Sequence, residues 1–342
     1  MKDAINLALW VSAPYLNDAI LADPNPADPD KRLASFCRLK SAIENLGGSC
    51  HTQDVFLRSG QIPDVVLFLD IPVKPVSILL REWGGKVRKW VLLQECGVII
   101  PRNWDMSLHA QFDRIFTWND GIVDDKRYFK FNYGNILPTV IPKNLARKNK
   151  LCAIIAGHRR SGHFLELYSK REETARWFEQ NHPADFDLYG YGWDEYVFGG
   201  PRFVRALNRV KFLKRLFAPA FPSYKGQVQN KVSILENYRF SICYENSRDA
   251  VGYITEKIFD CFAAGCVPVY WGALNIKDHI PAECFLDKRV FPSYEALYER
   301  MNTMTDVEYL SRLAAIESFL KSEKGREFSV EGFAETIVKG LP

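Results

Sequence analysis

The sequence predicts an α/β protein made of two Rossmann-like domains that face each other across a cleft. In both halves of the 342-residue chain, short apolar runs alternate with helical patterns, and a basic, proline-bearing stretch without periodicity separates the halves at 138–150. Alternating strands and helices are typical of parallel sheets, which bind ligands at the carboxyl ends of their strands. We therefore expect one domain at 1–145 and a second, with C-terminal helices, at 146–342.

In the first half, the apolar runs are nearly continuous and end in polar residues, as buried parallel strands do. Strands are predicted over 5–13, 64–71, 88–95 and 114–120. An amphipathic helix is predicted over 32–48, because Gly47 and Gly48 at its end form a typical stop signal.

The same alternation restarts after the linker. Strands are predicted over 151–158, 185–192, 238–246 and 267–272, helices over 166–182 and 255–265, and two further helices in the tail at 306–342. One segment, 201–217, combines apolar residues near helical spacing with a cluster of arginines. It has two interpretations: a helix that packs on the second domain with a solvated basic face, which we favour, or a helix that docks to an anionic membrane.

The composition is that of an ordinary globular protein, with 47% apolar and 25% charged residues and a formal net charge of +4. A mildly basic chain suits a phosphorylated ligand or an anionic surface. The start of the chain lacks the pattern of a signal peptide, and no apolar run approaches the ~18–20 residues of a membrane helix. We therefore expect a cytoplasmic protein, peripheral at most at the inner face of the membrane. The eight scattered cysteines indicate reduced, buried thiols.

Polar side chains are concentrated in the stretch ENSRDAVGYITEK, residues 245–257, which follows a predicted strand. Gly252 permits an unusual backbone angle. Thr255 is expected to cap a helix whose first turn holds Glu256 and Lys257. A helix N-terminus beside a lysine can bind an anion, and a neighbouring carboxylate suits sugar hydroxyls. The stretch therefore predicts a sugar-nucleotide pocket, the alternative being an ordinary helix start with a solvated lysine.

The sequence around this stretch resembles a known family. Residues 238–273, YRFSICYENSRDAVGYITEKIFDCFAAGCVPVYWGA, are similar to the signature of the α1,3/4-fucosyltransferases, glycosyltransferase family 10. The likeness is clearest over 151–273 and thinner in the first domain. It implies a GT-B architecture in which the second domain holds GDP-fucose and the first holds the acceptor. It also implies inversion, so that GDP-β-L-fucose yields an α-L-fucoside.

By motif position, the resemblance implies donor-binding roles for Glu245, Asn246, Ser247, Tyr253, Thr255, Glu256 and Lys257. Within this set, Glu256 would hold ribose hydroxyls and Lys257 a phosphate. Lys225 resembles a basic residue of a family segment. Arg171 resembles an arginine that follows the first strand of the donor domain, and it fits a solvated helix position equally well. Where the family carries an arginine near DLYGYGW, this chain has Tyr191, which leaves the diphosphate-binding arginine unassigned.

An inverting transfer needs a base on the side of the sugar opposite the leaving group. The family carries a glutamate at the end of a strand in the first domain, and KWVLLQEC offers Glu95 there. Asp70 and Asp120 end neighbouring predicted strands and are the alternatives. The plainer interpretation of Glu95 is a capping or salt-bridged residue.

No metal and no cofactor are expected. The Asp-x-Asp string at Asp28–Asp30 lies in a proline-rich loop without a preceding strand, and the six histidines lack ligand spacing. Cations and helix N-termini would then neutralise the leaving group. We expect a metal-independent α1,3-fucosyltransferase acting on an N-acetylglucosamine-containing oligosaccharide or lipid-linked glycan, as in lipopolysaccharide biosynthesis. The alternatives are transfer of another GDP-linked deoxysugar and a non-catalytic GDP-sugar- or glycan-binding protein. No nucleic-acid partner is expected.

Overall fold

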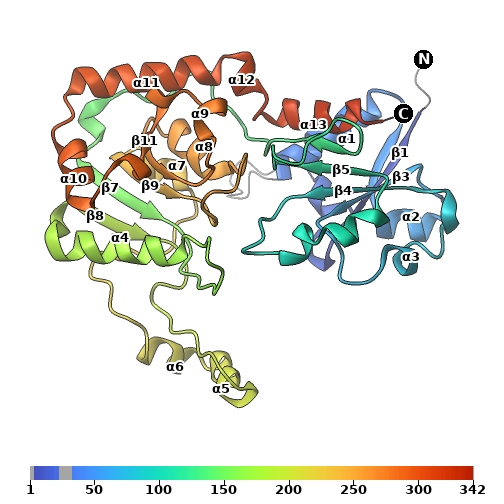
Figure 1. Ribbon diagram of the computed structural model, residues 1–342, viewed down its shortest axis with the longest axis horizontal. Coiled ribbons are helices and arrows are strands. Elements are labelled where there is room, and N and C mark those ends of the chain that lie inside the picture. The colour runs from blue at the N-terminus through green and yellow to red at the C-terminus, as the bar shows by residue number, and fades with distance from the viewer. Residues whose placement is uncertain (1–3, 23–32, 342) are drawn as a thin grey trace.

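The computed structural model describes residues 4–22 and 33–341, so that Asp28–Asp30 lie outside the described residues. Within these ranges the strands form a six-stranded sheet in the order β2-β1-β3-β4-β5-β6 and a five-stranded sheet in the order β11-β10-β9-β7-β8. Every pairing between neighbouring strands is parallel. Figure 1 shows the two sheets in separate domains, side by side. The prediction of two Rossmann-like α/β domains is confirmed.

The first domain contains β1 (Asn6–Trp10), α1 (Leu33–Glu44), β2 (Ser49–Thr52), α2 (Gln53–Ser59), β3 (Val65–Leu69), α3 (Val76–Leu79), β4 (Arg88–Leu93), β5 (Arg114–Thr117) and β6 (Tyr128–Lys130). All residues of β3 except the last are buried, which explains its continuous apolar sequence. Gly47 follows α1 with a φ of +83°, as a helix stop requires. The edge strands β2 and β6 are short and carry polar residues, so the sequence did not predict them.

The second domain contains β7 (Lys150–Ile155), α4 (Tyr168–Asn181), β8 (Phe186–Tyr189), α5 (Arg202–Ala206), α6 (Lys211–Leu216), α7 (Lys231–Leu235), β9 (Tyr238–Tyr244), α8 (Glu256–Ala263), β10 (Val267–Trp271), α9 (Ile276–His279), β11 (Leu286–Asp287) and α10 (Tyr294–Asn302). The chain passes from β7 to β8 on one side, and then returns to β9 on the other side of β7. Such a change of direction is the point where open parallel sheets bind ligands, so the carboxyl ends of β7 and β9 mark the expected site.

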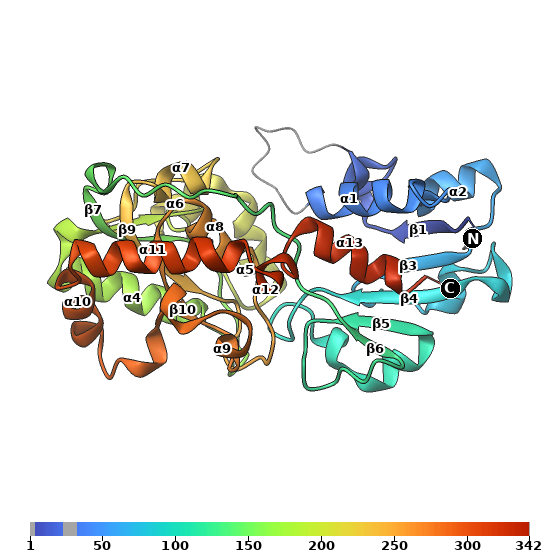
Figure 2. The ribbon, with the colours of Figure 1, turned by 90° about the horizontal axis from the view of Figure 1, so that it is seen from above.

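The C-terminal region runs back along both domains as α11 (Asp306–Leu320), α12 (Glu323–Arg326) and α13 (Val330–Lys339), as Figure 2 shows. The sequence predicted two helices here and assigned them to the second domain. α13 instead packs on α1, and the rings of Phe333 and Phe36 lie 5.6 Å apart. Its apolar face completes the core of the first domain. The sequence could not show this, because the two helices lie almost 300 residues apart in the chain.

Residues 194–218, here called the arm, project from the second domain between β8 and α7 (Figure 1). The sequence favours a helix over 201–217 that packs on the second domain. The structure instead has α5 and α6, separated by a 3₁₀ turn at Leu207–Arg209. Of the described residues of α5 and α6, none is buried. The predicted packing on the domain is therefore wrong. In the part of the chain that the structure describes, no helix has the length and apolar character needed to cross a bilayer.

The carboxyl ends of the two sheets meet at the domain interface. Trp118, which follows β5, packs its ring 4.7 Å from that of Tyr253 in the second domain. Asp120 accepts hydrogen bonds from Asn275 Nδ2 and His279 Nε2, both at 2.7 Å. Gly252 has a φ of +82°, and a Cβ there would lie 2.2 Å from the Trp118 carbonyl oxygen. Only glycine fits at this point of close approach.

Candidate functional site

A buried carboxylate organises the corner formed by residues 245–257. β9 ends at Tyr244, and the next residue, Glu245, is completely buried. Its Oε1 accepts from the Thr255 N–H at 2.8 Å, and its Oε2 accepts from Thr255 Oγ1 at 2.7 Å and Lys257 Nζ at 3.0 Å. Three donors compensate for the solvation that the carboxylate loses. Glu245 therefore fastens the start of α8 to the end of β9.

Thr255 occupies the predicted N-cap position of α8, with extended backbone angles. Its hydroxyl does not act as a cap, because it donates to Glu245 and accepts from Lys257 Nζ at 2.8 Å. The first turn of α8 thus receives no side-chain cap from Thr255. A helix N-terminus in this state presents its N–H groups and positive dipole end to an anion.

Lys257 and Glu256 form the first turn of α8. Burial lowers the pKa of Lys257, but the negative charges of Glu245 and Glu256 outweigh this effect, so the pKa is raised and the ammonium stays charged. The side chain of Lys257 is 21% exposed. That of Glu256 is 31% exposed, and its Oε1 lies 3.8 Å from Lys231 Nζ and 3.9 Å from Lys257 Nζ. Glu256 is therefore accessible to a hydroxyl-bearing ligand.

Arg171 lies in the first turns of α4 and is buried, so the solvated position that the sequence left open is excluded. Its Nη2 donates to the carbonyl oxygens of Tyr244 at 2.7 Å and Glu245 at 2.8 Å, and to Asn246 Oδ1 at 3.1 Å. Burial lowers the pKa of Arg171, opposed by Tyr168 and Glu245. Arg171 therefore reaches the corner and holds the end of β9 in place.

The remaining predicted residues of the corner lie against protein. Asn246 Nδ2 donates to Tyr253 Oη at 3.4 Å. Tyr253 is 1% exposed, and burial raises its pKa well above the usual range. Ser247 is also buried, and its hydroxyl donates to the Arg248 carbonyl oxygen at 3.2 Å. These contacts fix the shape of the loop between β9 and α8.

The structure does not bring Lys225 to this corner. Its Nζ lies 3.5 Å from Asp187 Oδ1. Asp187 also accepts from Tyr238 Oη at 2.6 Å and lies 3.3 Å from Lys150 Nζ. Lys150 and Tyr238 begin β7 and β9, so Lys225 Nζ lies at the amino end of the sheet, opposite to the corner. The prediction of a donor-binding role for Lys225 has no support in this geometry.

An arginine that sequence reasoning missed lies in the loop after β7. Arg159 Nε donates to Tyr191 Oη at 2.8 Å. The family resemblance implies an arginine at the position of Tyr191. In this chain the hydrogen bond places the guanidinium of Arg159, from a different loop, beside that position. The hydrogen bond to Tyr191 and the charge interactions raise the pKa of Arg159, although burial opposes them. Burial raises the pKa of Tyr168, while the charges of Arg171 and Arg159 oppose this effect. The run GHRRSGH directly after a predicted strand could have indicated this loop.

Glu95 follows β4 in a turn that other side chains hold in place. The backbone N–H groups of Gln94 and Glu95 donate to Asp70 Oδ1 at 2.7 and 3.0 Å. Asn103 Nδ2 donates to the same oxygen at 2.6 Å, and Trp104 Nε1 donates to the Glu95 carbonyl oxygen at 3.2 Å. The position of the backbone at Glu95 is therefore tightly determined.

The turn that contains Glu95 lies at the domain interface, close to the second domain. Burial is the largest cause of the raised pKa of Tyr253, and the negative charge of Glu95 adds to it. The neighbouring Cys96 thiol forms a hydrogen bond with Tyr253, which lowers the thiol pKa, whereas burial raises it. Gly97 lies beside His163 of the loop after β7, because a Cβ there would be 3.9 Å from His163 Nε2. The turn at Glu95 thus meets both loops of the second domain.

Both alternative bases have structural partners. Asp70 has a φ of +62° and accepts the three hydrogen bonds that support the turn at Glu95. Burial raises the pKa of Asp70 despite these bonds. Asp120 accepts from Asn275 and His279 and lies 2.5 Å from Lys130 Nζ. Asp70 thus supports the turn at Glu95, and Asp120 joins the first domain to Asn275 and His279 of the second.

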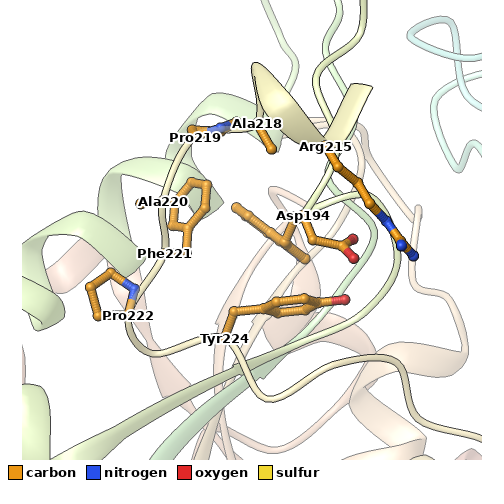
Figure 3. A pocket seen from close by; sticks show the side chains of 9 residues that line it. Asp194, Arg215, Ala218, Pro219, Ala220, Phe221, Pro222 and Tyr224 are labelled. Atoms are coloured by element: carbon orange, nitrogen blue, oxygen red, sulfur yellow. The ribbon is translucent and has the colours of Figure 1, made fainter. Parts of the chain in front are cut away.

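A pocket of 490 Å³ lies away from this corner, at the base of the arm. Figure 3 shows Asp194, Arg215 and Tyr224 around it, with Pro219 and Phe221 on the opposite side. In the described ranges, no group of three or more His, Cys, Asp or Glu side chains is placed to hold a metal ion.

Comparisons with known proteins find similar sequences in the second domain. Residues 200–312 match the family model described as glycosyltransferase family 10 (fucosyltransferase), C-terminal part. The chain is 28% identical over 97 residues to an alpha-(1,3)-fucosyltransferase of Helicobacter pylori, covering 26% of this chain and 20% of that protein. It is 32% identical over 115 residues to a mouse 4-galactosyl-N-acetylglucosaminide 3-alpha-L-fucosyltransferase 9, covering 30% and 32%. The matched segments thus span a third or less of these relatives.

Similarity in structure extends over nearly the whole chain. A crystal structure of an alpha1,3-fucosyltransferase with GDP-fucose has 13% sequence identity and a TM-score of 0.55, with 98% of this chain and 90% of that chain covered. An Anabaena protein in complex with UDP and glucose has 12% identity and a TM-score of 0.57, covering 98% and 99%. At these identities the matches confirm the GT-B fold. Residues 200–312, about a third of the chain, are in addition similar to the C-terminal part of the glycosyltransferase family 10 fucosyltransferases.

Proposed function

We propose that the protein is an inverting fucosyltransferase that uses GDP-β-L-fucose as donor and a glycan hydroxyl as acceptor. The observation that carries the proposal is the position of the corner: the Glu245 network holds the first turn of α8 at the switch point between β7 and β9, opposite Glu95 of the first domain. An anion site and a carboxylate on opposite sides of one interface are what inversion requires.

The proposed donor site uses the positive groups of this corner. Lys257 and the N-terminus of α8 neutralise the diphosphate, and Glu256 accepts hydrogen bonds from the ribose hydroxyls. Arg159, brought to Tyr191 by its 2.8 Å hydrogen bond, is the proposed second cation for the diphosphate. Arg171 and Glu245 act as positioning residues, because their polar atoms bind the protein itself.

In the proposed reaction, Glu95 takes the proton of the acceptor hydroxyl while the hydroxyl oxygen forms a bond to C1 of fucose. The bond from C1 to the phosphate oxygen breaks, and its electron pair leaves with GDP. The positive charges of Lys257, Arg159 and the α8 N-terminus stabilise the developing negative charge on the β-phosphate. Glu95 and the diphosphate lie on opposite sides of the sugar, so the product is an α-L-fucoside.

For the acceptor, we propose α1,3 transfer to an N-acetylglucosamine-containing oligosaccharide or lipid-linked glycan, as in lipopolysaccharide biosynthesis. The support is the naming of the matched relatives, which include an alpha-(1,3)-fucosyltransferase and a 4-galactosyl-N-acetylglucosaminide 3-alpha-L-fucosyltransferase. The matched relatives also include an alpha-(1,4)-fucosyltransferase of Arabidopsis thaliana, 32% identical over 72 residues. Their names therefore support fucosyl transfer more strongly than they support the α1,3 linkage.

The test is incubation of the purified protein with GDP-fucose and a β1,4-linked galactosyl-N-acetylglucosamine disaccharide. We expect GDP release that depends on acceptor, and a product whose anomeric proton coupling identifies an α-fucoside. Linkage analysis then locates the substituted oxygen. A β-fucoside would contradict inversion. Galactose occupies O4 of N-acetylglucosamine in this acceptor, so the β1,3-linked isomer, in which O4 is free, is assayed in parallel. Transfer only to O4 of that isomer would contradict the proposed α1,3 specificity while leaving fucosyl transfer in place.

A further inference from the structure

The arm carries a concentration of positive charge that the proposed reaction does not use. Residues 200–217, GPRFVRALNRVKFLKRLF, contain six Lys and Arg residues and no Asp or Glu. The whole chain has 45 Lys and Arg against 41 Asp and Glu, so the remaining 39 cations outside the segment are outnumbered by the acidic residues. The positive balance of the chain therefore comes from the arm.

The arm also exposes large apolar side chains. Of the 21 exposed large hydrophobic side chains found in the described residues, seven lie in the 21 residues from 197 to 217. Phe203 is 75% exposed, Phe212 70% and Leu216 63%. Single exposed apolar residues are normal, but a cluster of this density on a projecting element marks an interaction surface.

The outer part of the arm is folded on itself. Lys214 forms an ion pair with Glu195, and the Tyr196 N–H donates to the Lys214 carbonyl oxygen at 2.7 Å. The rings of Phe198 and Phe217 lie 5.7 Å apart. In Figure 1, α5 and α6 lie well away from both sheets, at the end of two extended connections. The tip of the arm is thus held as a small unit that presents its side chains to the surroundings.

We propose that the arm docks the protein to an anionic phospholipid surface. Basic residues interleaved with Phe and Leu match such a surface, because the cations attract acidic headgroups while the apolar side chains enter the boundary with the acyl chains. A second copy of the arm would be repelled by its like charge. A nucleic acid would bind the cations and stack on phenylalanines, but would leave Leu207, Val210 and Leu216 exposed. The lipid surface satisfies both kinds of side chain.

Docking to a bilayer would also bear on the acceptor of the proposed reaction. Only this point about the acceptor rests on the proposed function. An enzyme held at a bilayer by its donor domain would meet a glycan whose lipid anchor lies in the same bilayer.

The experiment is flotation of the full chain with vesicles of phosphatidylcholine containing about a third phosphatidylglycerol, compared with pure phosphatidylcholine, at low ionic strength. We expect binding to the anionic vesicles only, weakening as salt shortens the screening length to about 10 Å at 0.1 M. Each cation near an anionic surface contributes about fivefold in partitioning, so the triple variant Arg202→Glu/Arg205→Glu/Arg209→Glu should lose at least about a hundredfold. The triple variant Phe203→Ser/Phe212→Ser/Leu216→Ser should lose a similar factor.

A matched control carries the same charge change elsewhere: Lys74, Arg81 and Lys126 are exposed in the first domain, and their reversal to glutamate should leave vesicle binding within about threefold. Three outcomes would overturn the proposal: no binding of wild-type protein to anionic vesicles at low salt, equal losses in the arm and control variants, or tighter binding to a short RNA or DNA duplex than to the vesicles. Both arm variants should keep GDP affinity and transfer to a soluble disaccharide. Failure of the wild-type protein to bind anionic vesicles, with transfer intact, would count against the docking proposal alone, whereas absent transfer in wild-type protein would count against the proposed function.

Discussion

The corner at 245–257 and the arm at 194–218 belong to the same domain and are both rich in charged residues, yet they are built in opposite ways. In the corner, Glu245 is completely buried and Thr255 is 3% exposed, and their polar atoms bind one another. In the arm, none of the described residues of α5 and α6 is buried. The corner is held by the fold, whereas the arm projects from it.

Charge has a different role in each region. A charge that the protein itself neutralises, such as Glu245 beside Lys257, contributes to a preorganised site. Charge without a counter-charge in its own segment, as in residues 200–217, points to a partner outside the molecule.

The largest effect is expected at Glu95, where the two domains meet. Glu95→Gln keeps the shape of the side chain and removes its basicity. General-base assistance contributes ~10²–10⁴ in rate, so turnover on GDP-fucose and acceptor should fall by that factor. GDP affinity, measured by calorimetric titration, should stay nearly unchanged. Near wild-type turnover would move the base to another residue, and Asp120→Asn would be assayed next.

The next effect separates the corner from the arm by stability. Glu245→Ala removes the partner of Lys257 from a buried ion pair, which typically costs about 3–5 kcal/mol of the free energy of unfolding. The arm variant Arg202→Glu/Arg205→Glu/Arg209→Glu changes exposed residues, and should stay within about 0.5 kcal/mol. Urea denaturation of both variants makes the comparison. Equal losses would mean that the arm, too, is held by the fold.

The donor cations are expected to contribute less. A hydrogen bond to a charged group is worth ~1.5–3 kcal/mol, so Lys257→Ala and Arg159→Ala should each weaken GDP binding by roughly ten- to a hundredfold. Because Lys257→Ala also leaves Glu245 unpaired, it is measured beside the double variant Lys257→Ala/Glu245→Gln. Lys225→Ala, at the amino end of the sheet, is the control and should bind GDP normally. Unchanged affinity in the Lys257 and Arg159 variants would remove both from the donor site.

A smaller, pH-dependent effect is expected at the domain interface. Burial raises the pKa of Asp120, but the hydrogen bonds from His279, Lys130 and Asn275 outweigh it and lower the pKa below the usual value of 3.8. A lowered carboxyl pKa contributes stability that is present above about pH 4 and is lost as the pH falls through the folded-state value. Asp120→Asn should therefore cost about 1–3 kcal/mol at pH 7 and less at pH 3. A cost that is equal at both pH values would contradict this assignment.

The smallest effect is expected from chelation. In the described ranges no cluster of potential ligands is placed to hold a metal ion, and the corner carries cations of its own. Treatment with EDTA should therefore change turnover by less than about twofold. Complete loss, restored by Mn²⁺ or Mg²⁺, would place a metal in the mechanism.

The sequence predicted the sheets and the corner because both depend on local patterns. The apolar runs gave β3 and β4, and the motif at 245–257 identified the polar turn after β9. The sequence also anticipated that Thr255 precedes α8, but not that its hydroxyl binds Glu245. That bond depends on the depth at which Glu245 is buried, which no local pattern reveals.

Long-range placement was not predictable in the same way. Arg159 and Tyr191 lie 32 positions apart, so their hydrogen bond follows only from the neighbouring positions of β7 and β8. Lys225 was chosen by segment similarity, whereas its side-chain direction is set by Asp187 on the adjacent strand. The arm has a helical pattern, but packing on the domain requires a complementary apolar face, and its exposed side chains show that it meets none there.

The central claim is that the corner and Glu95 together form the site of a GDP-fucose-dependent transferase. A donor screen tests it most directly: GDP-fucose, GDP-mannose, a GDP-linked deoxysugar other than fucose and UDP-glucose are each incubated with the protein without acceptor, and nucleotide release is followed over hours. The account predicts slow release of GDP from GDP-fucose and little or none from the others. Release from another GDP-deoxysugar in preference would change the donor, and no release from any donor by a protein that binds GDP would contradict catalysis.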